Sequence, residues 1–211
     1  RAAELIRKAK KPIIIAGGGV LYSGATAELK AFAERHQIPV SETQAGKSSL
    51  SWDHPLNFGS IGVTGSSAAN AVAADADLVI GIGTRFQDFT TGSWALFKNA
   101  GKKILAINIE PYDALKHGAI SVVGDARTVL EELEPMLGDH AAPAPDASLR
   151  DKWLDAVNAV TADPGNNVLP SDAHVIGAVQ RSVDENAIVL CASGGLPGEL
   201  HKLWRPVRPN G

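Results

Sequence analysis

The sequence contains a single cysteine, Cys191, among its 211 residues. One cysteine excludes a disulfide within the chain and a zinc site built from several thiolates. Neither sign of charge is in large excess, because 20 Lys and Arg residues against 23 Asp and Glu residues give a formal net charge of −3. No basic cluster stands out, which argues against a nucleic-acid partner, since binding to a phosphate backbone depends on concentrated positive charge.

Long apolar runs are missing as well, and the longest extend over only a few residues. No segment is long enough to cross a membrane and no signal peptide is visible, so we expect the protein in the cytoplasm. The composition, with 45% hydrophobic and 20% charged residues, is that of an ordinary globular domain. The first residues begin in the middle of a predicted helix, and the last follow a newly begun motif. We therefore expect the chain to be part of a longer protein.

Strand-like and helix-like segments alternate from residue 1 to about residue 137. Five short apolar runs are typical of strands buried on both faces, and helical patterns separate most of them. The runs span residues 13–15, 38–42, 77–80, 103–109 and 120–123. This alternation predicts an α/β domain with a doubly wound, Rossmann-like parallel sheet of five or six strands. We expect Ser23 to cap the helix that ends near His36, and residues 48–65 to form an irregular loop.

Glycine or small polar residues follow each of the five runs. In a parallel sheet the carboxyl ends of the strands meet at one edge, which is the usual ligand edge. These segments are residues 17–19, 43–46, 81–85, 108–110 and 124–125. If a nucleotide binds there, we expect Arg85 near a phosphate, because arginine offers a fork of donors to phosphate oxygens. The alternative is that the glycines serve tight turns alone, without any ligand.

Two titratable residues in this region have competing interpretations. Glu42 ends a predicted strand, where dinucleotide-binding folds place an acidic residue for the ribose, but we interpret it as a solvated strand-end carboxylate. His54 precedes Pro55 and is therefore restricted to an extended conformation. We interpret His54 as a structural histidine rather than a catalytic one.

A proline- and alanine-rich stretch at residues 138–148 predicts a linker. Helical patterns follow at residues 149–160 and 171–184, the second capped by Ser171. Residues 187–191 then predict one more buried strand, and a further helix is predicted to end at about Trp204.

The chain carries dispersed motifs in a fixed order: AGGGV, PVSETQAGKSSL, DHPLNFGSIGVTG, DLVIGIGTRFQDFTTGSW, INIEP and GDA. This order resembles the central domain of thiamine-diphosphate-dependent enzymes, and the resemblance covers essentially the whole chain. The segments ETQAGK, FTTGSW and GGLPGELHKLW are most similar to the branch that hydrolyses a carbon–carbon bond of a cyclic diketone in inositol catabolism. Other branches are 2-keto-acid decarboxylases and carboligases of the acetohydroxyacid synthase type, and semialdehyde decarboxylases.

Members of this family have a pyrimidine-binding, a central and a diphosphate-binding domain. The resemblance implies a central domain at residues 1–137, a linker at 138–170 and the start of the diphosphate-binding domain at 171–211. It also implies thiamine diphosphate and Mg²⁺ in a full-length homo-oligomeric enzyme, with the other two domains as partners of this one. We expect no catalytic residue and no metal ligand in this chain, and the isolated chain to be inactive.

The resemblance also implies a set of cofactor-binding positions. In one branch the central domain holds FAD along the ligand edge, and in others it holds ADP or nothing. Gln87 departs from the FAD-binding branch, where an acidic residue stands, and a hydrolase needs no flavin redox step. Three of the positions, Ser193, Gly194 and Gly195, resemble the first loop of the diphosphate-binding domain and would approach thiamine diphosphate in the intact enzyme. The positions are Gly17, Gly18, Gly19, Thr43, Gln44, Gly83, Thr84, Arg85, Asn108, Ile109, Asp125, Ala126, Ser193, Gly194 and Gly195.

Two other classes of protein remain as alternatives. A nucleotide-binding or deacetylase domain of the sirtuin type also has a GT turn and an I-N-x-E segment, as at residues 83–84 and 107–110. Against it, the GAGxS loop, the HGS-type histidine and the zinc cysteines are missing from the sequence. The second alternative is a scaffold that buries subunit surface and binds nothing.

Overall fold

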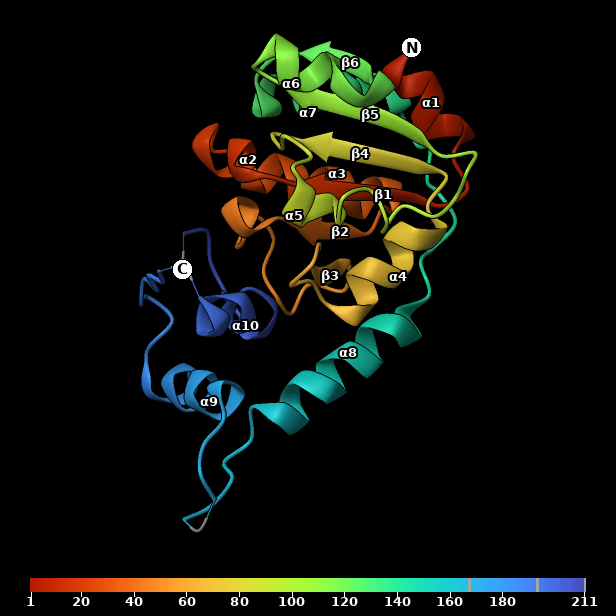
Figure 1. The fold of residues 1–211 in the computed structure, drawn as a ribbon. Helices are drawn as coiled ribbons and strands as arrows, with labels where there is room; N and C mark the ends of the chain where they lie inside the picture. Colours follow the sequence, from red (N-terminus) through yellow and green to blue (C-terminus); the bar gives the residue numbers. More distant parts are fainter. Residues whose placement is uncertain (167, 193, 211) are drawn as a thin grey trace.

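The centre of the molecule is one sheet of six parallel strands in the order β3-β2-β1-β4-β5-β6 (Figure 1). The computed structural model describes residues 1–166, 168–192 and 194–210. The strands are β1 (Pro12–Ala16), β2 (Val40–Glu42), β3 (Asn57–Ser60), β4 (Leu78–Ile82), β5 (Lys103–Asn108) and β6 (Ile120–Val123). The strand order reverses between β1 and β4, which confirms the predicted doubly wound sheet.

Helices cover both faces of this sheet (Figure 1). On one face Ile14, Ile80 and Leu105 pack against α1 (Ala2–Lys8), α3 (Thr26–His36) and α7 (Ala126–Leu137). On the other face Ile13 and Val79 pack against α4 (Ser67–Asp75), whose N-terminus is capped by the Ser66 hydroxyl. Because neighbouring residues of β1 and β4 point to opposite, equally buried faces, these strands are unbroken apolar runs.

Short elements follow the strands at the carboxyl edge of the sheet. They are α2 (Gly18–Tyr22), the 3-10 turn η1 (Gln44–Gly46), α5 (Asp88–Thr91) and α6 (Pro111–Leu115). The 3-10 turn η2 (Lys116–Gly118) comes after α6 and leads into the amino end of β6. No helix in the part of the chain that the structure describes is long and apolar enough to span a membrane.

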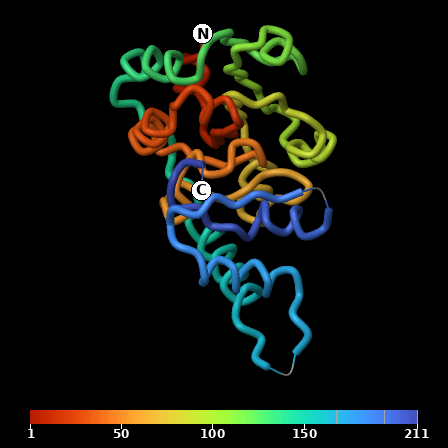
Figure 2. The backbone as a smooth tube through the Cα atoms, turned by 90° about the vertical axis from the view of Figure 1, so that its left-hand side faces the viewer, coloured from red at the N-terminus to blue at the C-terminus, as the bar shows by residue number. Residues whose placement is uncertain are grey.

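The C-terminal part of the chain forms α8 (Ala147–Val160), α9 (Asp172–Ser182) and α10 (Gly195–Leu203). These helices pack on the β3 side of the sheet around a small apolar cluster that includes Phe58, Trp153 and Trp204. Figure 2 shows the blue C-terminal segment running beside the orange segment that holds β2 and β3. Ser171 caps α9 as predicted, and its side chain accepts a hydrogen bond from the backbone N–H of His174.

Three predictions about local structure are wrong. Ser23 ends α2 and does not begin α3, because Gly24 at φ +64° lets the chain leave one helix and start the next. Residues 57–60 form the edge strand β3 inside the predicted loop, with a single large apolar side chain, Phe58. Residues 187–191 form no strand, and Ile188 and Leu190 are exposed, because no neighbouring strand pairs with this extended segment.

Candidate functional site

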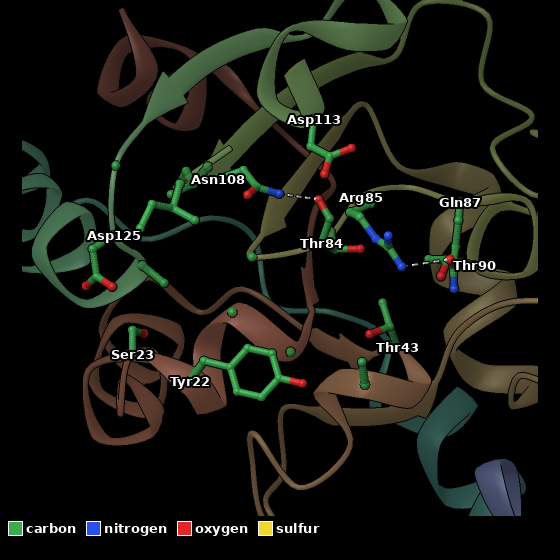
Figure 3. Close-up of a pocket in the computed structure, with 18 residues that line it drawn as sticks. Tyr22, Ser23, Thr43, Thr84, Arg85, Gln87, Thr90, Asn108, Asp113 and Asp125 are labelled. Carbon is green, nitrogen blue, oxygen red and sulfur yellow. Dashed lines mark hydrogen bonds between the residues drawn. The ribbon is translucent and has the colours of Figure 1, made fainter. Parts of the chain in front are cut away.

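A cavity of about 460 Å³ opens at the carboxyl edge of the sheet, where the strand order reverses (Figure 3). This is the position at which open α/β sheets bind ligands, and the volume lies in the range of small-molecule sites. The cavity is lined by Gly18, Gly19, Tyr22, Ser23, Thr43, Ala45, Gly83, Thr84, Arg85, Gln87, Thr90, Ile107, Asn108, Ile109, Asp113, Gly124, Asp125 and Ala126.

Glycines allow the turns after β1 and β4 to touch through their backbones. The N–H of Gly17 donates to the Ile82 carbonyl at 2.8 Å, and the N–H of Gly19 donates to the Gly83 carbonyl at 3.1 Å. A Cβ on Gly17 would lie 2.7 Å from the carbonyl carbon of Gly83, and Gly83 itself has φ +61°. Neither Gly17 nor Gly83 could carry a side chain without moving backbone, so both have a structural role whether or not a ligand binds.

Asn108 fixes the turn that follows β5. Its Nδ2 donates to the Thr84 carbonyl at 3.0 Å, and its Oδ1 accepts from the Glu110 N–H at 3.0 Å. The side chain therefore joins the ends of β4 and β5, as the dashed line in Figure 3 shows for the first bond. Ile109 follows and leaves its side chain 73% exposed at the mouth of the cavity.

The charge available in the cavity is positive. Asp113 is held by Lys116, with Nζ 2.7 Å from Oδ1, and Asp125 accepts hydrogen bonds from the backbone N–H groups of Arg127 and Thr128 at the start of α7. Arg85 is exposed, and among the described residues its guanidinium contacts only the Gln87 Oε1, at 3.5 Å. An anionic group entering the cavity would therefore meet a guanidinium with free donors.

The cavity brings together ten of the residues that the sequence predicted: Gly18, Gly19, Thr43, Gly83, Thr84, Arg85, Asn108, Ile109, Asp125 and Ala126. Gly17 lies behind the cavity in the backbone contact with Gly83, and Gln44 on η1 is exposed outside it. Gly194 and Gly195 lie at the start of α10, outside the cavity lining, and Ser193 lies outside the described residues.

Sequence reasoning missed Tyr22, Ser23, Thr90, Ile107 and Asp113 as cavity residues, and noted Gln87 only as a departure from a motif. Ala45 and Gly124 were predicted only as members of the ligand-edge segments 43–46 and 124–125, not as binding positions. Tyr22 was missed because the glycine run was taken as a turn, whereas Gly18 already begins α2. Had that helix been predicted, its 3.6-residue period would have placed Tyr22 one turn above Gly18, on the same side.

A second group of polar residues lies beside the cavity, at the ends of β2 and β3. Glu42 is 2% exposed and its Oε1 accepts from the Leu50 N–H at 3.0 Å, so the interpretation of a solvated carboxylate is wrong. Burial raises the pKa of Glu42, and the nearby Lys47 ammonium opposes that rise. Burial likewise lowers the pKa of Lys47, whose Nζ lies 3.4 Å from the Ser60 Oγ.

His201, which belongs to α10, contacts this group of polar residues. Its ring is 5% exposed, and its Nδ1 lies 2.9 Å from the Thr64 Oγ1, while its carbonyl accepts a hydrogen bond from the Ser60 hydroxyl. Burial lowers the pKa of His201 to about 4, and the Lys47 charge adds to the effect.

His54, in contrast, has both ring nitrogens engaged in local structure. Its Nδ1 accepts from the Leu56 N–H at 3.1 Å, and its Nε2 lies 2.9 Å from the Glu34 Oε1. These contacts tie the turn before β3 to α3, which supports the structural interpretation. Within residues 1–166, 168–192 and 194–210, no group of three or more His, Cys, Asp or Glu side chains could hold a metal ion.

Comparison with known proteins agrees with this architecture. Residues 1–133 match the family model described as the thiamine pyrophosphate enzyme, central domain. The chain therefore belongs to the thiamine pyrophosphate enzyme family, as the motif order predicted.

Individual relatives show which enzymes the chain resembles in sequence. The chain is 42% identical to the 3D-(3,5/4)-trihydroxycyclohexane-1,2-dione hydrolase of Clostridium tetani (strain Massachusetts / E88), over 99% of this chain and 37% of that protein. It is 40% identical to the protein of the same name from Bacillus thuringiensis (strain Al Hakam), with the same coverage. A third, from Clostridium perfringens, is 40% identical over 96% of this chain and 36% of that protein. The chain thus spans little more than a third of the length of these relatives.

Proposed function

We propose that this chain is the central portion of a thiamine-diphosphate-dependent hydrolase that opens a carbon–carbon bond of a cyclic 1,2-diketone in inositol catabolism. The observation that carries the proposal is 40–42% identity to trihydroxycyclohexanedione hydrolases over 96–99% of the chain. In this proposal residues 1–137 are the central domain, residues 138–170 a linker and residues 171–211 the start of the diphosphate-binding domain. The intact enzyme is a cytoplasmic homo-oligomer.

Thiamine diphosphate, when bound, supplies a nucleophilic thiazolium carbon and a sink for electrons. We assign none of the chemistry at the reacting carbon to residues of this chain. In the proposal that chemistry belongs to the pyrimidine- and diphosphate-binding domains of the intact enzyme.

The activity is tested on the intact protein with thiamine diphosphate and Mg²⁺. We expect ring opening of the trihydroxycyclohexanedione without release of carbon dioxide and without any change in added flavin. Pyruvate serves as the second substrate, because a decarboxylase or carboligase of the acetohydroxyacid synthase type would release carbon dioxide from it. Turnover of pyruvate without opening of the cyclic diketone would contradict the hydrolase proposal and favour the decarboxylase or carboligase.

For the cavity itself we propose the binding of a nucleotide, either ADP or FAD, across the turns after β1, β4 and β5. The supporting observation is electrostatic: both cavity carboxylates are engaged by protein groups, whereas the Arg85 guanidinium keeps donors free. A phosphate held by Arg85 would gain charge-assisted hydrogen bonds, which contribute about 1.5–3 kcal/mol each.

We expect Arg85→Gln to weaken binding of ADP and FAD about 10- to 150-fold, which is the Kd equivalent of one such hydrogen bond. Calorimetric titration with each nucleotide measures the change. Arg35→Gln is the matched control, because Arg35 is an arginine on α3 that does not line the cavity. If neither nucleotide binds the unaltered protein at millimolar concentration, the proposed nucleotide site is wrong and the scaffold interpretation is left standing.

A further inference from the structure

Tyr22 presents an uncovered aromatic ring to the cavity. It is the last residue of α2, it lines the cavity, and its side chain is 89% exposed. In Figure 3 Tyr22 lies on the α2 wall, between the end of the cavity marked by Asp125 and the end marked by Arg85. A ring in that place would contact whatever lies between the two ends.

Gly18 gives the ring its position. Gly18 lies one helical turn before Tyr22, and residues four apart on a helix are neighbours on its surface. A Cβ at Gly18 would lie 3.2 Å from the Tyr22 Cε2 and 3.2 Å from the Ala45 carbonyl oxygen. Because Gly18 has no side chain, the ring lies back over the start of α2 and forms part of the cavity wall instead of pointing straight into solvent.

The chemistry of this wall differs from that of the Arg85 end. A phenol ring offers a flat apolar face, and planar rings stack on such faces whatever their hydrogen-bonding edges. Ile109 adds a second exposed apolar side chain to the cavity lining. A ligand that uses both the cation and the ring must therefore carry an anionic group joined to a planar ring.

We propose that Tyr22 is the residue that selects the ring of the ligand: the planar ring system of a nucleotide stacks on Tyr22 while its phosphate is held by Arg85. This inference rests on the proposed nucleotide site and adds to it a residue that decides between a nucleotide and a simple phosphate. Gly18 is its positioning residue, since it leaves the space that the ring occupies.

The test compares ligands with and without a ring on the same variants. We expect Tyr22→Leu to raise the Kd of ADP roughly 5- to 150-fold, the loss that follows removal of one base-stacking aromatic side chain. The Kd of inorganic pyrophosphate should stay within about twofold of its original value, because pyrophosphate has no ring to stack. Tyr22→Phe keeps the ring and should bind ADP nearly as the unaltered protein does.

Tyr112→Leu is the matched control, since Tyr112 on α6 is another exposed tyrosine, 74% exposed, that does not line the cavity. Circular dichroism confirms that each variant is folded. If ADP binds Tyr22→Leu as tightly as the unaltered protein, the stacking role is wrong while the nucleotide site stands. If only FAD binds the unaltered protein, the same comparison is made with FAD in place of ADP, and if neither nucleotide binds at millimolar concentration, both proposals fall. If pyrophosphate weakens in Tyr22→Leu as much as ADP does, Tyr22 shapes the cavity without recognising a ring.

Discussion

Residues at the carboxyl edge of the sheet either hold the turns of the backbone together or line the cavity with exposed side chains. Gly17 and Gly83 bring two turns into contact, and Asn108 bridges the ends of β4 and β5 through both atoms of its amide. Arg85 and Tyr22 are exposed and contribute little to the packing of the domain. Substitutions of the two kinds should therefore have separable effects.

Gly17→Ala should destabilise the domain by at least about 2 kcal/mol. The new Cβ would lie 2.7 Å from the Gly83 carbonyl carbon and 2.7 Å from the Thr84 Cα, and backbone atoms cannot rotate away. Urea denaturation followed by circular dichroism measures the free energy of unfolding. Gly101→Ala is the control, because its Cβ would meet only the Asn99 Oδ1 at 3.4 Å. Equal stability of the two variants would contradict the account of the backbone contact.

At the scale of elements, the sequence predicted those whose apolar pattern is unambiguous. Buried strands β1, β4 and β5 and the amphipathic helix α7 were predicted for that reason. Strand β3 was not, because Asn57, Gly59 and Ser60 surround its single large apolar residue. Helix α2 was not predicted because its first residues are glycines, which are poor helix formers. Glycine is needed there because the backbone lies in close contact with Gly83.

The site was predictable to a similar extent and for a related reason. The motif order and the strand ends located the residues on the turns after β1, β2, β4, β5 and β6. Side chains supplied by unrecognised short helices, such as Tyr22 on α2 and Asp113 on α6, could not be placed. The burial of Glu42 was also out of reach, because it depends on how segment 47–50 folds back over the carboxylate and on His201 of α10, which is distant in sequence.

Docking of α10 should weaken in acid. Burial lowers the pKa of His201 from 6.5 to about 4, so the unfolded chain takes up a proton below about pH 6.5 while the folded protein does not until about pH 4. The free energy of unfolding therefore falls as pH decreases across this window. Since one pKa unit corresponds to about 1.4 kcal/mol, His201 accounts for a loss on the order of 3 kcal/mol.

Glu42 acts in the opposite sense, because burial raises its pKa and its protonated form favours the folded state at low pH. The His201 contribution is isolated by comparing His201→Gln with the unaltered protein in urea at about pH 7 and about pH 4. We expect the free energy of unfolding to fall less for His201→Gln than for the unaltered protein between the two pH values. The same loss in both proteins would mean that the buried imidazole does not govern the acid sensitivity.

For the whole molecule, the six-stranded sheet and the C-terminal helices meet along β3, and α10 covers the carboxyl end of that edge strand (Figures 1 and 2). The polar group of Glu42, Lys47, Ser60, Thr64 and His201 lies at this junction, beside the turn that supplies Thr43 and Ala45 to the cavity. In the proposed enzyme, the junction joins the central domain to the beginning of the diphosphate-binding domain.

The reversal of strand order between β1 and β4 has a consequence for how such a domain can change over generations. The crevice exists because neighbouring connections leave the sheet on opposite faces, and no side chain is needed to hold it open. Mutations at Tyr22, Arg85 or Ile109 can thus change the lining of the cavity while the fold remains intact. A lineage could lose one ligand, pass through a state that binds nothing and acquire another, with folding preserved at every step.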